Sequence, residues 1–113
     1  MLSIYHNKRC SKSREGICFL ENLNKPFETI HYLEKMLTHT ELETIIIKLK
    51  IKPIELVRVK EKDWIENFKG KTLTDSEIIE AMLHYPKLIE RPIVINGKKA
   101  VIARPSELIN TIL

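Results

Sequence analysis

The sequence is poor in cysteine and has no long apolar run, internal repeat or low-complexity segment. Its 113 residues include only two cysteines, which are too few for the disulfide framework of many small secreted domains. No apolar stretch approaches the ~18 residues that a membrane-spanning helix requires. The first residues also lack the apolar core of a signal peptide. We therefore expect a cytoplasmic protein with reduced thiols and no membrane partner.

Signals for a metal ion or a nucleic acid are also missing. The histidines at 31, 39 and 84 have no metal-ligand spacing with either cysteine, so we expect no metal site. The net charge is +4 and residues 48–62 are rich in lysine. No aromatic interleaving or nucleic-acid motif accompanies these charges. We interpret the basic stretch as a solvated face and expect no nucleic-acid partner.

The composition is ordinary for a folded globular protein, with 43% hydrophobic and 30% charged residues. Residues 1–113 are long enough to form one domain with a real core. The apolar pattern predicts a strand over residues 2–6, a helix over 11–23 and a second strand over 27–32. A right-handed crossover would make these two strands parallel.

The middle of the chain has helical spacing. Either Thr38 or Thr40 can begin a helix, because each has a glutamate three residues later, as in a capping box. The apolar stripe Leu42, Ile45, Ile46 and Leu49 follows. Pro53 should end this helix, and a short helix over residues 54–59 is possible. A second capping box, from Thr74 to Glu77, predicts another helix that ends at Pro86.

The last third of the chain returns to strands. Residues 93–95 and 100–102 flank Asn96-Gly97, which predicts a hairpin with a type I′ turn. Ser106 can cap a last helix that carries Leu108, Ile109 and Ile112. A β-α-β unit followed by a β-β-α unit is the thioredoxin arrangement. The predicted fold class is thus α/β and thioredoxin-like, with a helical insertion over approximately residues 33–90.

The segment around Cys10 carries the clearest chemical signal. Cys10 lies between a predicted strand and a predicted helix, where free N–H groups and the helix dipole favour an anion. Four cations surround it in the sequence: Lys8, Arg9, Lys12 and Arg14. Such settings lower the pKa of a thiol, so Cys10 is a candidate nucleophile. The alternative is a small buried cysteine beside a solvated basic turn.

Cys18 is not expected to form a disulfide with Cys10. Eight positions separate the two on the predicted helix, about 12 Å along the axis, and a disulfide needs Cα atoms closer than about 7 Å. We expect Cys18 to pack against the core. In a thioredoxin fold, a proline before the third strand faces the reactive cysteine, usually after a cis peptide bond. Arg91-Pro92 fits that place; the alternative is an ordinary trans proline at a strand start.

With these features in view, the chain resembles the arsenate reductases of the glutathione/glutaredoxin-coupled type. The likeness covers nearly the whole chain and rests on four motifs in order. They are His6-Asn7-x-Arg9-Cys10-Ser11-Lys12-Ser13-Arg14, Leu56-Val57-Arg58-x-x-Glu61, Glu90-Arg91-Pro92-Ile93-Val94 and Ala103-Arg104-Pro105-Ser106-Glu107.

The resemblance implies the roles of the candidate site residues. Cys10 would be the nucleophile, and Arg58, Arg91 and Arg104 would surround arsenate or a similar oxyanion. A supporting set would surround the thiolate: His6, Asn7, Ser13, Arg14 and Pro92. Arg14 could contact the anion or pair with Glu15 or another acidic residue of the helix. The resemblance also implies glutathione as the reductant, a glutaredoxin as partner and no cofactor bound in the resting protein.

Ser13 stands three residues after Cys10, where a resolving thiol would otherwise lie, which agrees with an external thiol as reductant. Two other functions remain open. One is a general glutathione-dependent thiol–disulfide oxidoreductase, and the other is a redox-sensing regulator of the same superfamily that binds RNA polymerase. Lys8 departs from the family because proline usually occupies that position. The loop is therefore less rigid, or more cationic, than in the best-known members.

Overall fold

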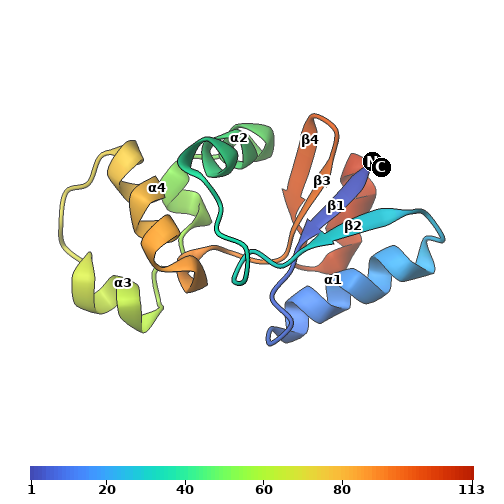
Figure 1. Cartoon of the computed structure of the whole chain (residues 1–113), viewed down its shortest axis with the longest axis horizontal. Coiled ribbons are helices and arrows are strands. Elements are labelled where there is room, and N and C mark those ends of the chain that lie inside the picture. Colours follow the sequence, from blue (N-terminus) through green and yellow to red (C-terminus); the bar gives the residue numbers. More distant parts are fainter. The chain divides into compact units, whose positions relative to one another are not determined.

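A four-stranded sheet unites the two ends of the chain in the computed structural model, which describes residues 1–113. The strands are β1 (Leu2–Tyr5), β2 (Phe27–Ile30), β3 (Ile93–Asn96) and β4 (Lys99–Ile102). Their order is β2-β1-β3-β4 (Figure 1). β2 is parallel to β1, and β3 is antiparallel to both β1 and β4. This is the predicted arrangement of a β-α-β unit beside a hairpin, and the parallel pairing of the first two strands is confirmed.

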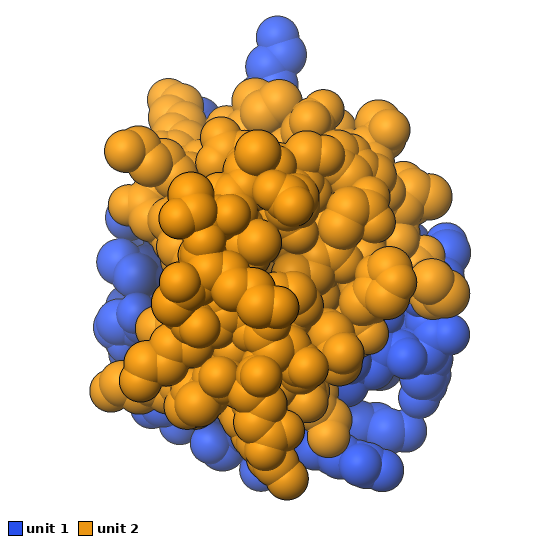
Figure 2. All heavy atoms as spheres, turned by 90° about the vertical axis from the view of Figure 1, so that its left-hand side faces the viewer, with its two compact units in different colours: residues 1–35, 91–113 blue, residues 36–90 orange.

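The chain divides into two compact units (Figure 2). Unit 1 consists of Met1–Lys35 and Arg91–Leu113 and contains the sheet. Unit 2 is the intervening segment Met36–Glu90, which is helical. The expectation that all 113 residues form a single domain, with the helical segment as an insertion, stays a prediction.

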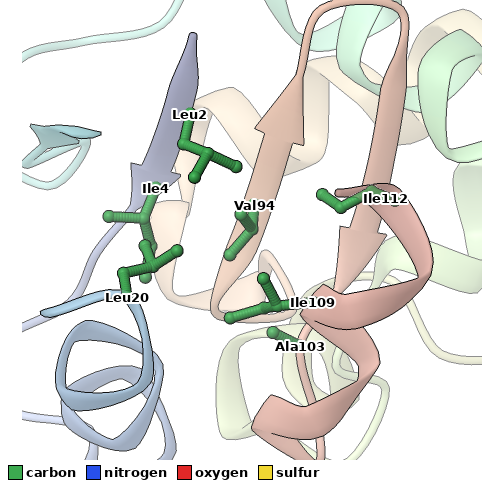
Figure 3. Close-up of a cluster of buried hydrophobic side chains, with 7 residues drawn as sticks. All are labelled: Leu2, Ile4, Leu20, Val94, Ala103, Ile109 and Ile112. Atoms are coloured by element: carbon green, nitrogen blue, oxygen red, sulfur yellow. The ribbon is translucent and has the colours of Figure 1, made fainter. Parts of the chain in front are cut away.

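The core of unit 1 lies against one face of the sheet. Leu2 and Ile4 of β1 and Val94 of β3 are buried there. Leu20 covers them from helix α1 (Ser11–Asn22), and Ile109 and Ile112 cover them from the 3-10 helix η3 (Ser106–Ile112). Figure 3 shows these side chains pointing toward one another. Burial of each large aliphatic side chain stabilises the fold by about 1.5–3 kcal/mol, so these contacts hold α1 and η3 against this face of the sheet.

Gly16 allows α1 to pack closely in this unit. It is buried, and a Cβ atom added there would lie 3.0 Å from Cγ of Pro92 and 3.1 Å from Cδ1 of Ile4. A larger residue would therefore push the helix away from the sheet or displace Pro92. The close approach sets the distance between the second turn of α1 and Pro92, just before β3.

Unit 2 contains α2 (His39–Leu49), η1 (Pro53–Leu56), α3 (Lys62–Asn67), α4 (Asp75–His84) and η2 (Pro86–Leu88). Of the two threonines that could begin α2, Thr38 is the N-cap, and it forms a capping box with Glu41. The box from Thr74 to Glu77 begins α4 as predicted. Helix α3 was not predicted, because its six residues carry too short an apolar pattern; Trp64 is its buried residue.

Two expectations for the C-terminal part are wrong. Asn96 pairs with Lys99, so the central residues of the hairpin turn are Gly97 and Lys98, and only Gly97 has a positive φ, +62°. That pattern belongs to a type II′ turn and not to type I′. Asn96 remains in the strand, where its Nδ2 donates to the carbonyl oxygen of Ile112 at 2.7 Å. The last helix is of the 3-10 type, with Pro105 and not Ser106 at its N-cap. None of the helices combines the length and the apolar character that a membrane span requires.

Candidate active site

Cys10 lies at the N-cap of α1, immediately after the loop that leaves β1. Its backbone is extended, with φ −98° and ψ 123°, and its side chain is half-buried. The main-chain N–H groups of Lys12 and Ser13 donate hydrogen bonds to its sulfur atom. These are among the helix N–H groups that have no partner within the helix. The sulfur therefore occupies the position in which a helix start stabilises an anion.

Arg91 supplies the side-chain contact to the same sulfur. Burial by itself raises the pKa of the Cys10 thiol, but the net shift is downward. The hydrogen bond from the Arg91 guanidinium, the hydrogen bonds from Ser13 and Lys12, and the positive charge of Arg91 together lower that pKa. A larger fraction of Cys10 is thus present as thiolate at neutral pH than for a free cysteine, and the thiolate is the nucleophilic form.

The loop before Cys10 is held in place by its own polar groups. The side-chain oxygen of Asn7 accepts a hydrogen bond from the backbone N–H of Arg9 at 3.0 Å. The backbone carbonyl of Asn7 accepts one from the N–H of Cys10, also at 3.0 Å. The fully buried Ser13 reaches back from the helix, and its Oγ accepts from the N–H of Asn7 at 3.0 Å. Asn7 and Ser13 thus hold the loop that leads to Cys10.

His6 extends this network at the end of β1. Its Nδ1 lies 3.0 Å from Oγ of Ser13, and its ring meets the ring of His31 edge-on with centroids 5.7 Å apart. Burial, followed by the charges of His31 and Arg14, lowers the pKa of His6, and the hydrogen bond with Ser13 only partly opposes this. His6 is therefore neutral at physiological pH. His31 was not singled out from the sequence, because its partner lies in a separate segment of the chain.

The β3–β4 hairpin brings Arg104 close to Arg91. Ile93 pairs with Ile102, so the two arginines flank the same end of the β3–β4 pair. Nη1 of Arg104 lies 3.5 Å from the backbone carbonyl oxygen of Arg91, to which it donates. Arg104 is exposed and Arg91 is half-buried. The Arg91–Pro92 peptide bond is cis, as predicted, and the Arg104–Pro105 bond is cis as well, which was not predicted although the dipeptide is the same.

Arg14 and Lys8 have structural partners in unit 1. Nη1 of Arg14 donates to the backbone carbonyl oxygen of Lys8 at 2.9 Å, so Arg14 braces the loop before Cys10. Glu15, the partner considered for Arg14, pairs instead with Lys12 at 3.5 Å. Lys8 lies 3.2 Å from Glu34 in an exposed ion pair. Such a pair contributes at most about 1 kcal/mol.

Arg58 belongs to unit 2, where two carboxylates flank it. Its Nε lies 3.7 Å from Oε1 of Glu90 and 4.0 Å from Oε1 of Glu61. Its backbone N–H donates to the carbonyl oxygen of Leu88 at 2.7 Å, beside the bridge between Val57 and Ile89. The guanidinium is thus oriented by acidic neighbours in its own unit. Its role in binding an oxyanion stays a prediction.

The expectation for Cys18 is wrong, because its side chain is exposed and does not pack into the core. On α1, the buried positions are Ser13, Gly16 and Leu20, and Cys18 lies on the opposite side of the helix. Both cysteines are free thiols. No group of three or more histidine, cysteine, aspartate or glutamate side chains is placed to hold a metal ion.

Comparisons with known proteins give a consistent result. The model of the ArsC family matches residues 5–112. The arsenate reductase of Haemophilus influenzae is 42% identical over 113 residues, which is 97% of each chain. The uncharacterized protein YfgD of Escherichia coli is 41% identical over 111 residues, 94% of this chain and 91% of that one.

Solved structures agree with the sequence relatives. The arsenate reductase from Vibrio cholerae superposes with a TM-score of 0.94 at 38% identity, covering 99% of this chain and 97% of that one. A protein of the same fold, YFFB (PA3664), superposes with a TM-score of 0.86 at 15% identity and covers 100% of this chain and 99% of that one. The thioredoxin-like α/β fold class predicted from the sequence is confirmed.

Proposed function

Because this chain belongs to the ArsC family, we propose that it reduces arsenate to arsenite through a covalent adduct on Cys10. The observation that carries the proposal is the environment of the Cys10 sulfur. Two helix N–H groups and the Arg91 guanidinium donate to it, and together they lower its pKa despite burial. A nucleophilic thiolate in a cationic, half-buried position suits an anionic electrophile.

Arg91 and Arg104 are the residues of unit 1 that would hold the oxyanion. Arsenate at neutral pH carries negative charge on oxygens arranged as in phosphate, and planar guanidinium groups bind such oxygens in pairs. The two arginines flank one end of the β3–β4 pair, so both can donate to one small anion. For Arg58 the role as third arginine rests on the sequence resemblance alone.

The first chemical step joins sulfur to arsenic. The Cys10 thiolate attacks arsenic, an S–As bond forms, and one As–O bond breaks as that oxygen leaves as water after protonation. Arsenic remains in the +5 state. The arginines offset the charge that builds up when an anionic nucleophile meets an anionic substrate.

The second half of the reaction needs an external thiol. Ser13 occupies the place of a resolving cysteine, and Cys18 lies on the opposite side of α1 from its buried residues. We therefore assign glutathione as the reductant and a glutaredoxin as its partner, in the cytoplasm, where thiols are kept reduced. Two donor sulfurs leave joined as a disulfide, arsenic takes up two electrons and becomes arsenite, and water releases it from Cys10. No bound cofactor is required.

The supporting residues act on the position of Cys10. Asn7 and Ser13 hold the loop, His6 holds Ser13, and Arg14 braces the carbonyl of Lys8. Pro92 packs within reach of Gly16 on α1 and so supports the segment that carries Arg91. None of these roles requires direct contact with arsenate.

The decisive experiment measures NADPH consumption in a mixture of the protein, arsenate, glutathione, a glutaredoxin and glutathione reductase. We expect arsenate-dependent turnover that disappears in Cys10→Ser and persists in Cys18→Ser. Cys18→Ser is the matched control because it removes the other thiol on the same helix. Absence of turnover in the wild-type protein would overturn the proposal. If Cys10 then still exchanged rapidly with small disulfides, the second candidate, a glutathione-dependent thiol–disulfide oxidoreductase, would replace it.

A further inference from the structure

A groove runs along the outer face of α1 in unit 1. Its volume is about 510 Å³, within the range of about 300–1,000 Å³ that is usual for small-molecule sites. Six residues of α1 and Ser106, at the start of η3, line it; the α1 residues include Ser11, Arg14, Glu15, Cys18 and Phe19. The groove has no role in the adduct chemistry described above.

One end of the groove lies near the proposed nucleophile, Cys10. Ser11 follows Cys10 directly, and the α1 residues at 11, 14, 15, 18 and 22 share one helix face. Ser106 comes two residues after Arg104 and borders the same groove. The groove therefore starts beside the predicted oxyanion site and extends away from it. From Ser11 to Asn22 the helix rises about 16 Å, and an extended tripeptide needs about 10 Å.

The chemistry of the lining matches a charged peptide with a free thiol. Arg14 uses Nη1 for the carbonyl of Lys8, so its remaining N–H groups can bind a carboxylate. The second carboxylate oxygen of Glu15, whose Oε2 pairs with Lys12, can accept from an ammonium group, and Phe19 supplies an apolar contact. Lys12 balances the charge of Glu15, so Arg14 leaves this surface with net positive charge. Glutathione has two carboxylates, one ammonium group and one thiol, so its net negative charge complements this surface.

We propose that glutathione binds in this groove, with its thiol toward the Cys10 end and its length along α1. The inference rests on the proposed function, because it assigns a place to the reductant of the second half-reaction. It also gives the exposed Cys18 a use as a reporter. This thiol lies in the groove about 10 Å along the helix axis from Ser11, so a bound tripeptide would shield it from reagents.

The binding test uses S-methylglutathione, which cannot exchange with thiols or reduce arsenic. In the Cys10→Ser protein, only Cys18 can be alkylated. We expect S-methylglutathione to slow the alkylation of Cys18 at least threefold and in a saturable manner. Glycine ethyl ester at the same ionic strength is the control and should have no effect. Equal alkylation rates with and without S-methylglutathione up to 20 mM would overturn the inference.

A kinetic test uses a bulky side chain to fill the groove. Cys18→Trp should raise the KM for glutathione at least fivefold and leave the KM for arsenate unchanged. Glu21→Trp is the matched control, because Glu21 is exposed on the same helix but does not line the groove. Far-UV circular dichroism and thermal unfolding establish that both variants fold.

The two tests separate this inference from the proposed function. Suppose that S-methylglutathione does not shield Cys18, that Cys18→Trp leaves the KM for glutathione unchanged, and that the wild-type protein still turns over arsenate. The proposed glutathione site would then be wrong, and the proposed arsenate reductase activity would stand. Shielded Cys18 without any arsenate turnover would support the glutathione site and overturn the proposed substrate.

Discussion

The Arg91 guanidinium donates a hydrogen bond to the Cys10 sulfur, although the two residues come from opposite ends of the chain. Cys10 begins the first helix, and Arg91 precedes the third strand. The antiparallel pairing of β1 with β3 places Tyr5 opposite Ile93. The loop after β1 and the segment before β3 therefore leave the sheet at the same end, which brings the cation to the thiolate.

The first prediction concerns the reactivity of Cys10. Arg91→Gln should raise the pKa of Cys10, because it removes both a hydrogen bond and a positive charge from the sulfur. The pH profile of alkylation should move to higher pH, measured in a Cys18→Ser background so that one thiol reacts. Arsenate turnover should fall by about a hundredfold, as when one oxyanion donor is lost. The control is Arg9→Gln, which removes an exposed cation near Cys10 and should not shift the pH profile of alkylation. Equal shifts in both variants would show that Arg91 has no specific effect on the pKa of Cys10.

The second prediction separates charge from geometry at Arg104. Arsenate should protect Cys10 from alkylation, and Arg104→Ala should raise the concentration for half-protection about tenfold, since a hydrogen bond to a charged group is lost. Arg104→Lys should restore only part of the protection, because lysine keeps the charge but not the planar fork. Lys98→Gln, in the hairpin turn, serves as the charge control. Full protection in Arg104→Ala would mean that this arginine only braces the carbonyl of Arg91.

The third prediction is a pH dependence of stability through His6. Burial and nearby positive groups hold the pKa of His6 below its ordinary value in the folded protein. The unfolded chain therefore binds a proton at this site at a higher pH than the folded protein does. The resulting stability is fully present above about pH 6.5 and is lost as the pH falls through the lowered pKa. Urea unfolding between pH 7.5 and 5 should show a smaller decrease for His6→Gln than for the wild type; parallel curves would contradict the prediction.

The fourth prediction tests the packing of α1. Gly16→Ala places a Cβ atom 3.0 Å from Pro92 and 3.1 Å from Ile4, two buried side chains with little room to move. Overpacking of this kind destabilises the fold by about 1–3 kcal/mol, and the higher helix propensity of alanine offsets about 1 kcal/mol of that loss. We expect a net decrease of about 1 kcal/mol in the free energy of unfolding, measured with urea. The control is Glu21→Ala, at an exposed position on the same helix, which should change the free energy of unfolding by less than about 0.5 kcal/mol. A Gly16→Ala protein more stable than the wild type would show that Pro92 can shift at little energetic cost.

The sequence predicts features that depend on residues close to one another along the chain. The capping box from Thr74 to Glu77 predicts where α4 begins, because its partners are three residues apart. The apolar stripe of α2 predicts its buried face, and Leu42, Ile45 and Ile46 are indeed buried. Cys10 could be placed at a helix start because a strand pattern precedes it and a helical pattern follows it. The role of Cys10 as nucleophile remains a proposal, as do the roles of the residues around it.

Local periodicity and capping predicted the four strands, the helices α1, α2 and α4 and the position of the thiol at a helix N-terminus. The right-handed crossover rule predicted the parallel pairing of β1 with β2. Three features became visible only in the folded chain: Arg91 reaches the Cys10 sulfur, Arg104 donates to the Arg91 carbonyl, and Cys18 faces outward. The folded chain also shows that the hairpin turns at Gly97 and Lys98. These features depend on strand register and on packing between segments that are distant in the chain, and local spacing does not encode either of them.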